Sequence, residues 1–187
     1  MTARVILVVS GSDRPGLTRA VAEAVHAAGG NWLESYLSRL GGKYVGSVLV
    51  ELDAAALPAL EAEVRKVDAT GLRVSIVPVE EAEPAENAPL LQIELLGQDR
   101  PGIVREVTSV LADLHANIES MTTSTESSAW SGEPLFRAKV QVALPENVTP
   151  DAVQTALEAI SGELMVDFTI TAAKAVRPTA GQTSRSS

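Results

Sequence analysis

The chain carries one short motif twice, as S-G-S-D-R-P-G-L at residues 10–17 and L-G-Q-D-R-P-G-I at residues 96–103. Each copy follows an apolar run and precedes a helical pattern, so we expect it to form the turn that begins a helix. The N–H groups at a helix start lack partners and carry about half a positive charge. Gly16 has no side chain to block a carboxylate from approaching them. The motif therefore predicts an anion site in each copy.

Acidic and amide side chains accompany each predicted anion site. Asp13 and Asp99 could each hold an ammonium group or cap the helix that follows. Asn31 and Asn117 can both donate and accept hydrogen bonds, and we expect them to contact the same α-amino and α-carboxyl groups. Backbone donors beside a carboxylate suit a zwitterion, so a free amino acid is the expected ligand. Ordinary turn and capping chemistry is the alternative for the same residues.

The repeat extends beyond the motif and predicts two small domains. Asn31 corresponds to Asn117, and residues 44–48 match residues 136–140 after a short insertion in the second copy. The expected domains are residues 1–79 and 90–173. Residues 80–89 are rich in Pro and Glu and are expected to form a linker. Residues 174–187, rich in Ser and Thr, are expected to be a disordered tail.

Hydrophobic patterning predicts the same element order, β-α-β-β-α-β, in both copies. In the first copy we expect strands at 5–9, 31–39, 43–52 and 72–77, with helices at 17–28 and 57–67. The strand at 5–9 is apolar throughout, as expected of a strand buried on both faces. In the second copy we expect strands at 91–96, 117–124, 135–144 and 164–170, with helices at 103–114 and from 149 onward. The fold class is therefore α+β: two ferredoxin-like units in tandem, each a four-stranded antiparallel sheet with two helices on one face.

Composition argues against several kinds of chemistry. The chain has 187 residues, no Cys, two His and a formal net charge of −9. Without cysteine it has neither thiol catalysis nor thiolate metal sites, and two histidines offer little for a zinc site or an acid–base relay. We therefore expect no catalytic residue, metal or cofactor. No apolar run is long enough to cross a membrane, so the expected location is the cytoplasm.

From residue 4 to 173 the sequence resembles the ACT domain family in its tandem form. The resemblance rests on G-S-D-R-P-G-L with Asn31 in the first copy, and on G-Q-D-R-P-G-I with A-N-I-E-S (116–120) in the second. Residues 121–136 look like the long hairpin of the second ACT domain in proteins similar to the glycine cleavage system transcriptional repressor. The family resemblance implies domains that pair and bind small effectors, usually amino acids, where domains meet.

The resemblance also implies which residues contact the effector. They come from the loop after the first strand and the start of the second strand: Ser12, Asp13, Arg14, Gly16, Leu17 and Asn31, with Gln98, Asp99, Arg100, Gly102, Ile103 and Asn117. One departure is Trp32, where the family pattern has Ile after Asn, so this side chain either reshapes the first pocket or fills the core. The insertion near 123–133 is expected to be a long loop, in which Trp130 could anchor a partner or be merely tolerated.

The leading hypothesis is a non-catalytic regulator that senses an amino acid and controls transcription, of the glycine cleavage or amino-acid metabolism type, through a protein partner. Direct binding to nucleic acid is not expected from an acidic chain, and a homodimer remains open. The alternative is a trans-acting regulatory subunit of an amino-acid or one-carbon metabolic enzyme. RNA binding shares this element order, but only Tyr44 and Phe136 lie where an RNA-binding sheet keeps its stacking aromatic residues.

Overall fold

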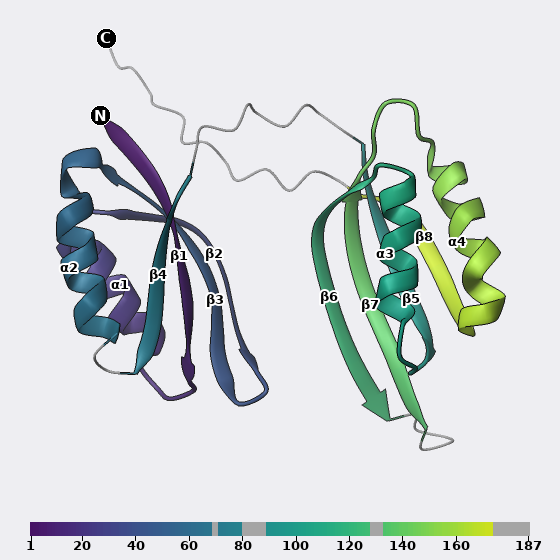
Figure 1. Ribbon diagram of the computed structural model, residues 1–187, viewed down its shortest axis with the longest axis horizontal. Helices are drawn as coiled ribbons and strands as arrows, with labels where there is room; N and C mark the ends of the chain where they lie inside the picture. Colours follow the sequence, from purple (N-terminus) through teal and green to yellow (C-terminus); the bar gives the residue numbers. More distant parts are fainter. Residues whose placement is uncertain (69–70, 80–88, 128–132, 174–187) are drawn as a thin grey trace, which may run out of the picture. The chain divides into compact units, whose positions relative to one another are not determined.

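The computed structural model describes residues 1–68, 71–79, 89–127 and 133–173. The chain forms two compact units, Met1–Pro84 and Ala85–Ser187, each with its own hydrophobic core. Each unit contains a four-stranded antiparallel sheet with two α-helices on one face (Figure 1). The predicted α+β class, with two ferredoxin-like units in tandem, is confirmed. The predicted linker (80–89, except Pro89), the predicted tail (174–187) and Trp130 lie outside the described residues.

The first unit follows the predicted element order. Its elements are β1 (Thr2–Ser12), α1 (Leu17–Ala27), β2 (Asn31–Leu40), β3 (Lys43–Asp53), a short 3-10 helix (Ala54–Ala56), α2 (Leu57–Asp68) and β4 (Leu72–Pro78). The sheet order is β2-β3-β1-β4. Gly41 and Gly42 both have positive φ, 56° and 77°, as a tight two-residue turn between β2 and β3 requires.

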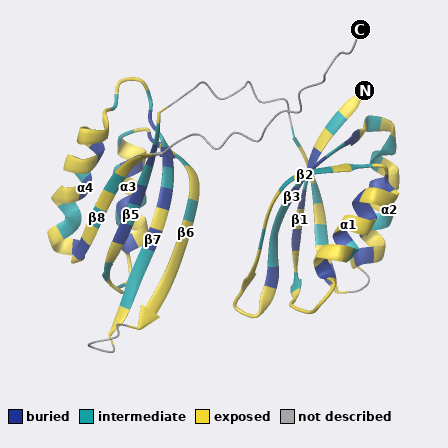
Figure 2. Cartoon of the chain, turned by 180° about the vertical axis from the view of Figure 1, so that it is seen from behind, coloured by how far each residue is buried: buried dark blue, intermediate teal, exposed yellow. Residues whose placement is uncertain are grey.

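The second unit repeats this arrangement. Its elements are β5 (Leu90–Gln98), α3 (Ile103–Asp113), β6 (Asn117–Ser127), β7 (Pro134–Ala143), α4 (Pro150–Leu164) and β8 (Val166–Ala173). The sheet order is β6-β7-β5-β8. Figure 2 shows that the inner strands β5 and β7 carry most of the buried residues of this sheet, whereas the edge strand β6 is mostly exposed.

The helices cover only one face of each sheet, which corrects one expectation about β1. Val5, Leu7 and Val9 are buried beneath α1 and α2, but Val8 points away from the helices and is 44% exposed. The apolar run at 5–9 therefore forms a central strand that is buried on one face rather than two. We refer to the sheet face away from the helices as the outer face.

Helix α1 begins at Leu17, as expected, and is preceded by Gly16 in a left-handed conformation. Two other boundaries differ from the sequence-based expectations. Residues 123–127 are not loop but the end of β6, paired with β7, since the β-branched Thr residues in this segment suit a strand. Leu164 ends α4 instead of starting the last strand, because Met165 takes the left-handed conformation that closes the helix.

The two tyrosines of the first unit lie on opposite faces of its sheet. Tyr44 is buried among the core residues, whereas Tyr36 is 68% exposed on the outer face. Phe136, the counterpart of Tyr44, also packs against a core. Neither Tyr44 nor Phe136 is therefore available on the outer face for stacking with bases, which removes the main sequence feature in favour of RNA binding.

The hydrogen bond between Tyr36 and Glu34 on the outer face can be tested through the pKa of Tyr36. The Tyr36 hydroxyl donates a hydrogen bond to Glu34 Oε1 at 2.6 Å, and this bond and the carboxylate charge raise the pKa of Tyr36 above its ordinary value. Because the neutral phenol is favoured, the pair contributes stability that is lost as the pH rises through the raised pKa. In a Tyr44→Phe background, Glu34→Gln should lower the Tyr36 pKa, measured by tyrosinate absorbance. An unchanged titration would mean that this hydrogen bond does not form in solution.

Candidate ligand-binding loops

The two D-R-P-G loops present helix N-termini that no side chain caps. Helix α1 begins after Gly16 (φ 93°) and α3 after Gly102 (φ 101°), and neither has a side-chain cap hydrogen bond among the described residues. By contrast, Thr149 caps α4 by accepting a hydrogen bond from Ala152 N at 3.2 Å. The uncapped start is therefore a feature of the repeated motif and not of helices in this chain generally.

The first-turn amides of these helices are available to a ligand. The first helical hydrogen bond of α1 runs from Ala20 N to Gly16 O at 3.0 Å, so the N–H groups of Leu17 and Thr18 precede it. The same pattern holds in α3, where Glu106 N donates to Gly102 O at 3.0 Å. A Cβ added at Gly16 would meet nothing within 4 Å. The space beside Gly16 is therefore open, whereas a Cβ added at Gly102 would meet Glu106 Oε1 at 3.5 Å.

The motif aspartates do not act as helix caps. The Asp13 carboxylate instead faces Arg39, with an Nε–Oδ2 distance of 3.2 Å. Backbone N–H groups of Asp13 and Asp99 donate to the neighbouring hairpins, at Gly42 O (3.3 Å) and Pro134 O (2.9 Å). An exposed ion pair such as Asp13–Arg39 contributes about 1 kcal/mol or less. Its carboxylate can therefore exchange Arg39 for an ammonium group at little cost.

Arg100 in the second loop contains an unsatisfied donor. Its Nε atom is buried without a hydrogen-bond partner among the described residues, and its Nη2 lies 3.8 Å from Glu106 Oε2. A buried N–H without a partner costs about 1–3 kcal/mol, and more when the group is charged. An anion that reached this atom would relieve that cost. Sequence patterning alone could not identify this atom, because its burial depends on the packing of the loop.

The first loop has a side-chain hydrogen bond that the second loop lacks. The Tyr44 hydroxyl and Thr18 Oγ1 lie 2.8 Å apart, which ties β3 to the first turn of α1. The corresponding residues in the second unit are Phe136 and Val104, which cannot form this bond. The two loops share a backbone design but differ in how their helix starts are supported, a difference that the matched motifs do not reveal.

Of the other loop residues predicted to contact the ligand, some are buried and others are exposed. Leu17 and Ile103 are buried core residues, so only their backbone amides could contact a ligand. Ser12 accepts a hydrogen bond from Lys43 Nζ at 3.1 Å, and Gln98 Nε2 donates to Glu133 Oε2 at 2.7 Å. Arg14 is exposed.

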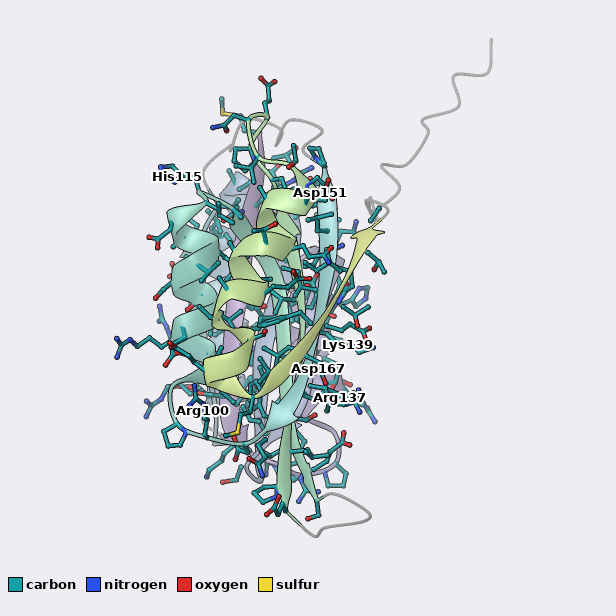
Figure 3. The ribbon with its side chains drawn as sticks, turned by 90° about the vertical axis from the view of Figure 1, so that its right-hand side faces the viewer. Arg100, His115, Arg137, Lys139, Asp151 and Asp167 are labelled. Carbon is teal, nitrogen blue, oxygen red and sulfur yellow. The ribbon has the colours of Figure 1, made fainter. Side chains whose placement is uncertain are left out.

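The predicted asparagines lie far from the loops of their own units. Asn31 pairs with Glu51 on β3, whereas Ser12, next to Asp13, pairs with Lys43 on the same strand. Eight residues of strand separate these points, or about 26 Å at about 3.3 Å per residue. Asn117 and Gln98 are separated in the same way along β7, opposite Ala143 and Leu135. Figure 3 shows Arg100 at one end of α3 and His115, next to the start of β6, at the other.

This separation revises the expected geometry of the site. Within one unit, an amino acid cannot contact both the loop and the asparagine, because the ligand is far shorter than the sheet. The Asn117 side chain donates instead to Glu119 Oε1 at 2.7 Å. To contact both a D-R-P-G loop and an asparagine, a ligand would need the asparagine end of another sheet to lie beside that loop. A second copy of the chain could supply such a sheet. Trp32, beside Asn31, packs against the first core, so it fills the core instead of shaping a pocket.

The described residues contain no group of three or more His, Asp or Glu side chains placed to hold a metal ion. His115 is an exposed residue with φ 57° that follows the end of α3. Among the described helices, none combines the length and apolar character that crossing a membrane requires.

Comparison with known proteins agrees with the observed fold. The ACT domain family matches at residues 3–76, and a second ACT domain model matches at residues 91–160. An unknown protein from Galdieria sulphuraria has a similar structure, with 29% identity, a TM-score of 0.78 and coverage of 93% of this chain and 100% of that one. A protein proposed to be a glycine cleavage system transcriptional repressor shares the fold at 17% identity, with a TM-score of 0.68 and coverage of 93% and 99%. No curated protein sequence matches this chain.

Proposed function

Because the chain belongs to the ACT domain family, we propose that it is a non-catalytic regulatory protein that binds a free amino acid at its D-R-P-G loops. The observation that carries this proposal is the uncapped helix start behind a left-handed glycine, present in both units. An amino-acid carboxylate would accept hydrogen bonds from the first-turn amides, and the motif aspartate would face the ammonium group. The buried, unpaired Nε of Arg100 favours an anion at the second loop.

The proposed output is control of transcription in amino-acid metabolism, in the cytoplasm and through a protein partner. The support is the resemblance of residues 121–136 to the hairpin of the glycine cleavage repressor family, together with the acidic net charge of −9. An acidic chain binds DNA poorly, so a DNA-binding partner would contact the operator. Co-purification from the native host tests this step. Recovery of a DNA-binding protein agrees with it, whereas recovery of a metabolic enzyme favours the alternative, a regulatory subunit acting in trans.

Isothermal titration calorimetry against the twenty proteinogenic amino acids tests the ligand. We expect saturable binding of at least one amino acid to the full chain. The double variant Asp13→Ala/Asp99→Ala should bind it about tenfold more weakly or worse, because each substitution removes a charge-assisted partner of the ammonium group.

Asp151→Ala is the matched control for this experiment. Asp151 also lies in the first turn of a helix, but Thr149 caps that helix, so the loss of this carboxylate should leave binding unchanged. The proposal fails if no amino acid binds, or if Asp151→Ala weakens binding as much as the double variant does.

A further inference from the structure

A separate hollow lies at the end of the first sheet where β1 finishes. Its volume is about 530 Å³, within the range of small-molecule sites. The residues that give it its chemistry are Ser10, Ser12, Lys43, Asp68, Gly71 and Arg73. None of these except Ser12 belongs to the predicted amino-acid site, and the hollow extends toward β4 instead of toward the start of α1.

Strand register brings two hydroxyls and two cations to the same outer face of this sheet. Ser10 lies opposite Arg73 on β4, and Ser12 lies opposite Lys43 on β3. Lys43 Nζ donates to Ser12 Oγ at 3.1 Å, which directs the ammonium group toward the two serines of β1. Residues directly opposite each other on neighbouring strands point to the same side. The four side chains therefore converge because of the pairing and not by chance proximity.

The two cations are available to a ligand. Neither Lys43 nor Arg73 forms an ion pair with a carboxylate among the described residues, and both are exposed. Asp68, the acidic residue of the lining, accepts a backbone hydrogen bond from Val74 N at 3.2 Å. The lining thus carries two positive charges and one negative charge in a chain whose net charge is −9.

The second unit lacks this donor set, although its backbone is the same. The repeat places Leu96 at the position of Ser10 and Leu135 at the position of Lys43. Asp167 lies opposite Leu96, as Arg73 lies opposite Ser10. Two leucines and an acid replace the hydroxyl and the two cations. The cationic hollow is therefore not a by-product of the fold, which forms equally well without it.

We propose that this hollow binds the phosphate group of a small molecule. A guanidinium can donate two parallel hydrogen bonds to a phosphate, an ammonium adds a compact charge, and the hydroxyls serve the remaining oxygen. Three phosphate oxygens offer more acceptor positions to this set of donors than the two oxygens of a carboxylate, and a phosphate also carries more negative charge. The site does not use the Asp13 carboxylate or the first-turn amides of α1. Its failure would leave the amino-acid proposal untouched, and the reverse also holds.

Titration of the full chain, followed by amide NMR, tests the proposal. Inorganic phosphate and glycerol 3-phosphate are added separately at constant ionic strength, so that general screening does not change. We expect saturable shifts of the Gly11 and Gly71 amides and none at Gly97, the counterpart of Gly11 in the second unit. If glycerol 3-phosphate binds more tightly than inorganic phosphate, the site is assigned to a phosphate ester. If inorganic phosphate binds equally well or more tightly, the site is assigned to the free phosphate anion.

Three variants complete the test. Arg73→Asp copies the second unit and should weaken phosphate binding by about tenfold or more. Ser10→Leu, also copied from the second unit, should weaken it without changing the charge. Arg137→Leu removes a cation from the outer face of the second sheet (Figure 3) and should have no effect. Shifts that do not saturate, a wild-type affinity in Arg73→Asp, or an equal loss in Arg137→Leu would each overturn the proposal.

Discussion

A chain with alanine at both Gly16 and Gly102 is expected to bind its amino-acid ligand at least about a hundredfold more weakly than the wild type. Both glycines have positive φ, 93° and 101°, at the residue that starts a helix. A Cβ added at Gly16 would enter open space, and one added at Gly102 would meet Glu106 Oε1 at 3.5 Å. In the proposed binding mode, each Cβ would stand where the ligand carboxylate approaches the first-turn amides. The loss of two charge-assisted hydrogen bonds, at about 1.5–3 kcal/mol each, accounts for an effect of this size.

Gly29→Ala is the control for strain in this experiment. Gly29 also has a positive φ (72°), and a Cβ added there would meet nothing within 4 Å, but it lies beyond the other end of α1. Each of these alanines should cost about 1–2 kcal/mol of stability through the left-handed backbone. Only the loop variants should lose binding in calorimetry. Equal affinities for the loop variants and Gly29→Ala would exclude these loops as the site.

Gly46→Ala is expected to destabilise the first unit by about 4 kcal/mol or more. Gly46 lies within β3 with φ 152°, and a Cβ there would overlap the backbone oxygen of Tyr36 on β2. Backbone atoms cannot rotate away as a flexible side chain can, so β2 and β3 would have to separate. Effects of this size are exceptional for a single substitution and result from this kind of overlap.

Urea denaturation followed by amide NMR measures this loss separately in each unit. Resonances of the first unit should disappear at lower urea concentration in Gly46→Ala, while those of the second unit should keep their midpoint. Gly162→Ala, in α4, is the control: nothing lies within 4 Å of the added Cβ, and alanine favours a helix by about 1 kcal/mol over glycine. If Gly46→Ala unfolds at the wild-type midpoint, then β2 does not approach β3 this closely in solution.

The sequence predicted the fold well because its signals are local. The apolar spacing of Val21, Val25 and their neighbours indicates a helix, and the pair Gly41–Gly42 indicates a tight hairpin, whatever lies elsewhere in the chain. The cap at Thr149 was also readable from its order with Pro150. Repetition of the whole pattern then indicated two units of one fold.

The candidate site was only partly predictable. The D-R-P-G motif correctly indicates a turn before a helix, but not that its aspartate faces Arg39 instead of capping the helix. The buried Nε of Arg100 and the Tyr44–Thr18 pair depend on side chains that the fold brings from other elements. The motif suggested one compact site with Asn31, whereas strand register places that asparagine at the far end of the sheet.

The sequence by itself therefore determined the two-unit architecture, the element order and the D-R-P-G turn before the first helix of each unit, because hydrophobic period, turn residues and glycine content act over a few neighbours. Tertiary structure decided the remaining features. It separated the loop from the asparagine, gathered Ser10, Lys43 and Arg73 into one hollow, and placed Gly46 against the backbone oxygen of Tyr36, where the counterpart of this glycine is Ala138. Each of these depends on which residues of distant strands lie opposite each other, and that pairing follows from the register of the whole sheet and not from local sequence.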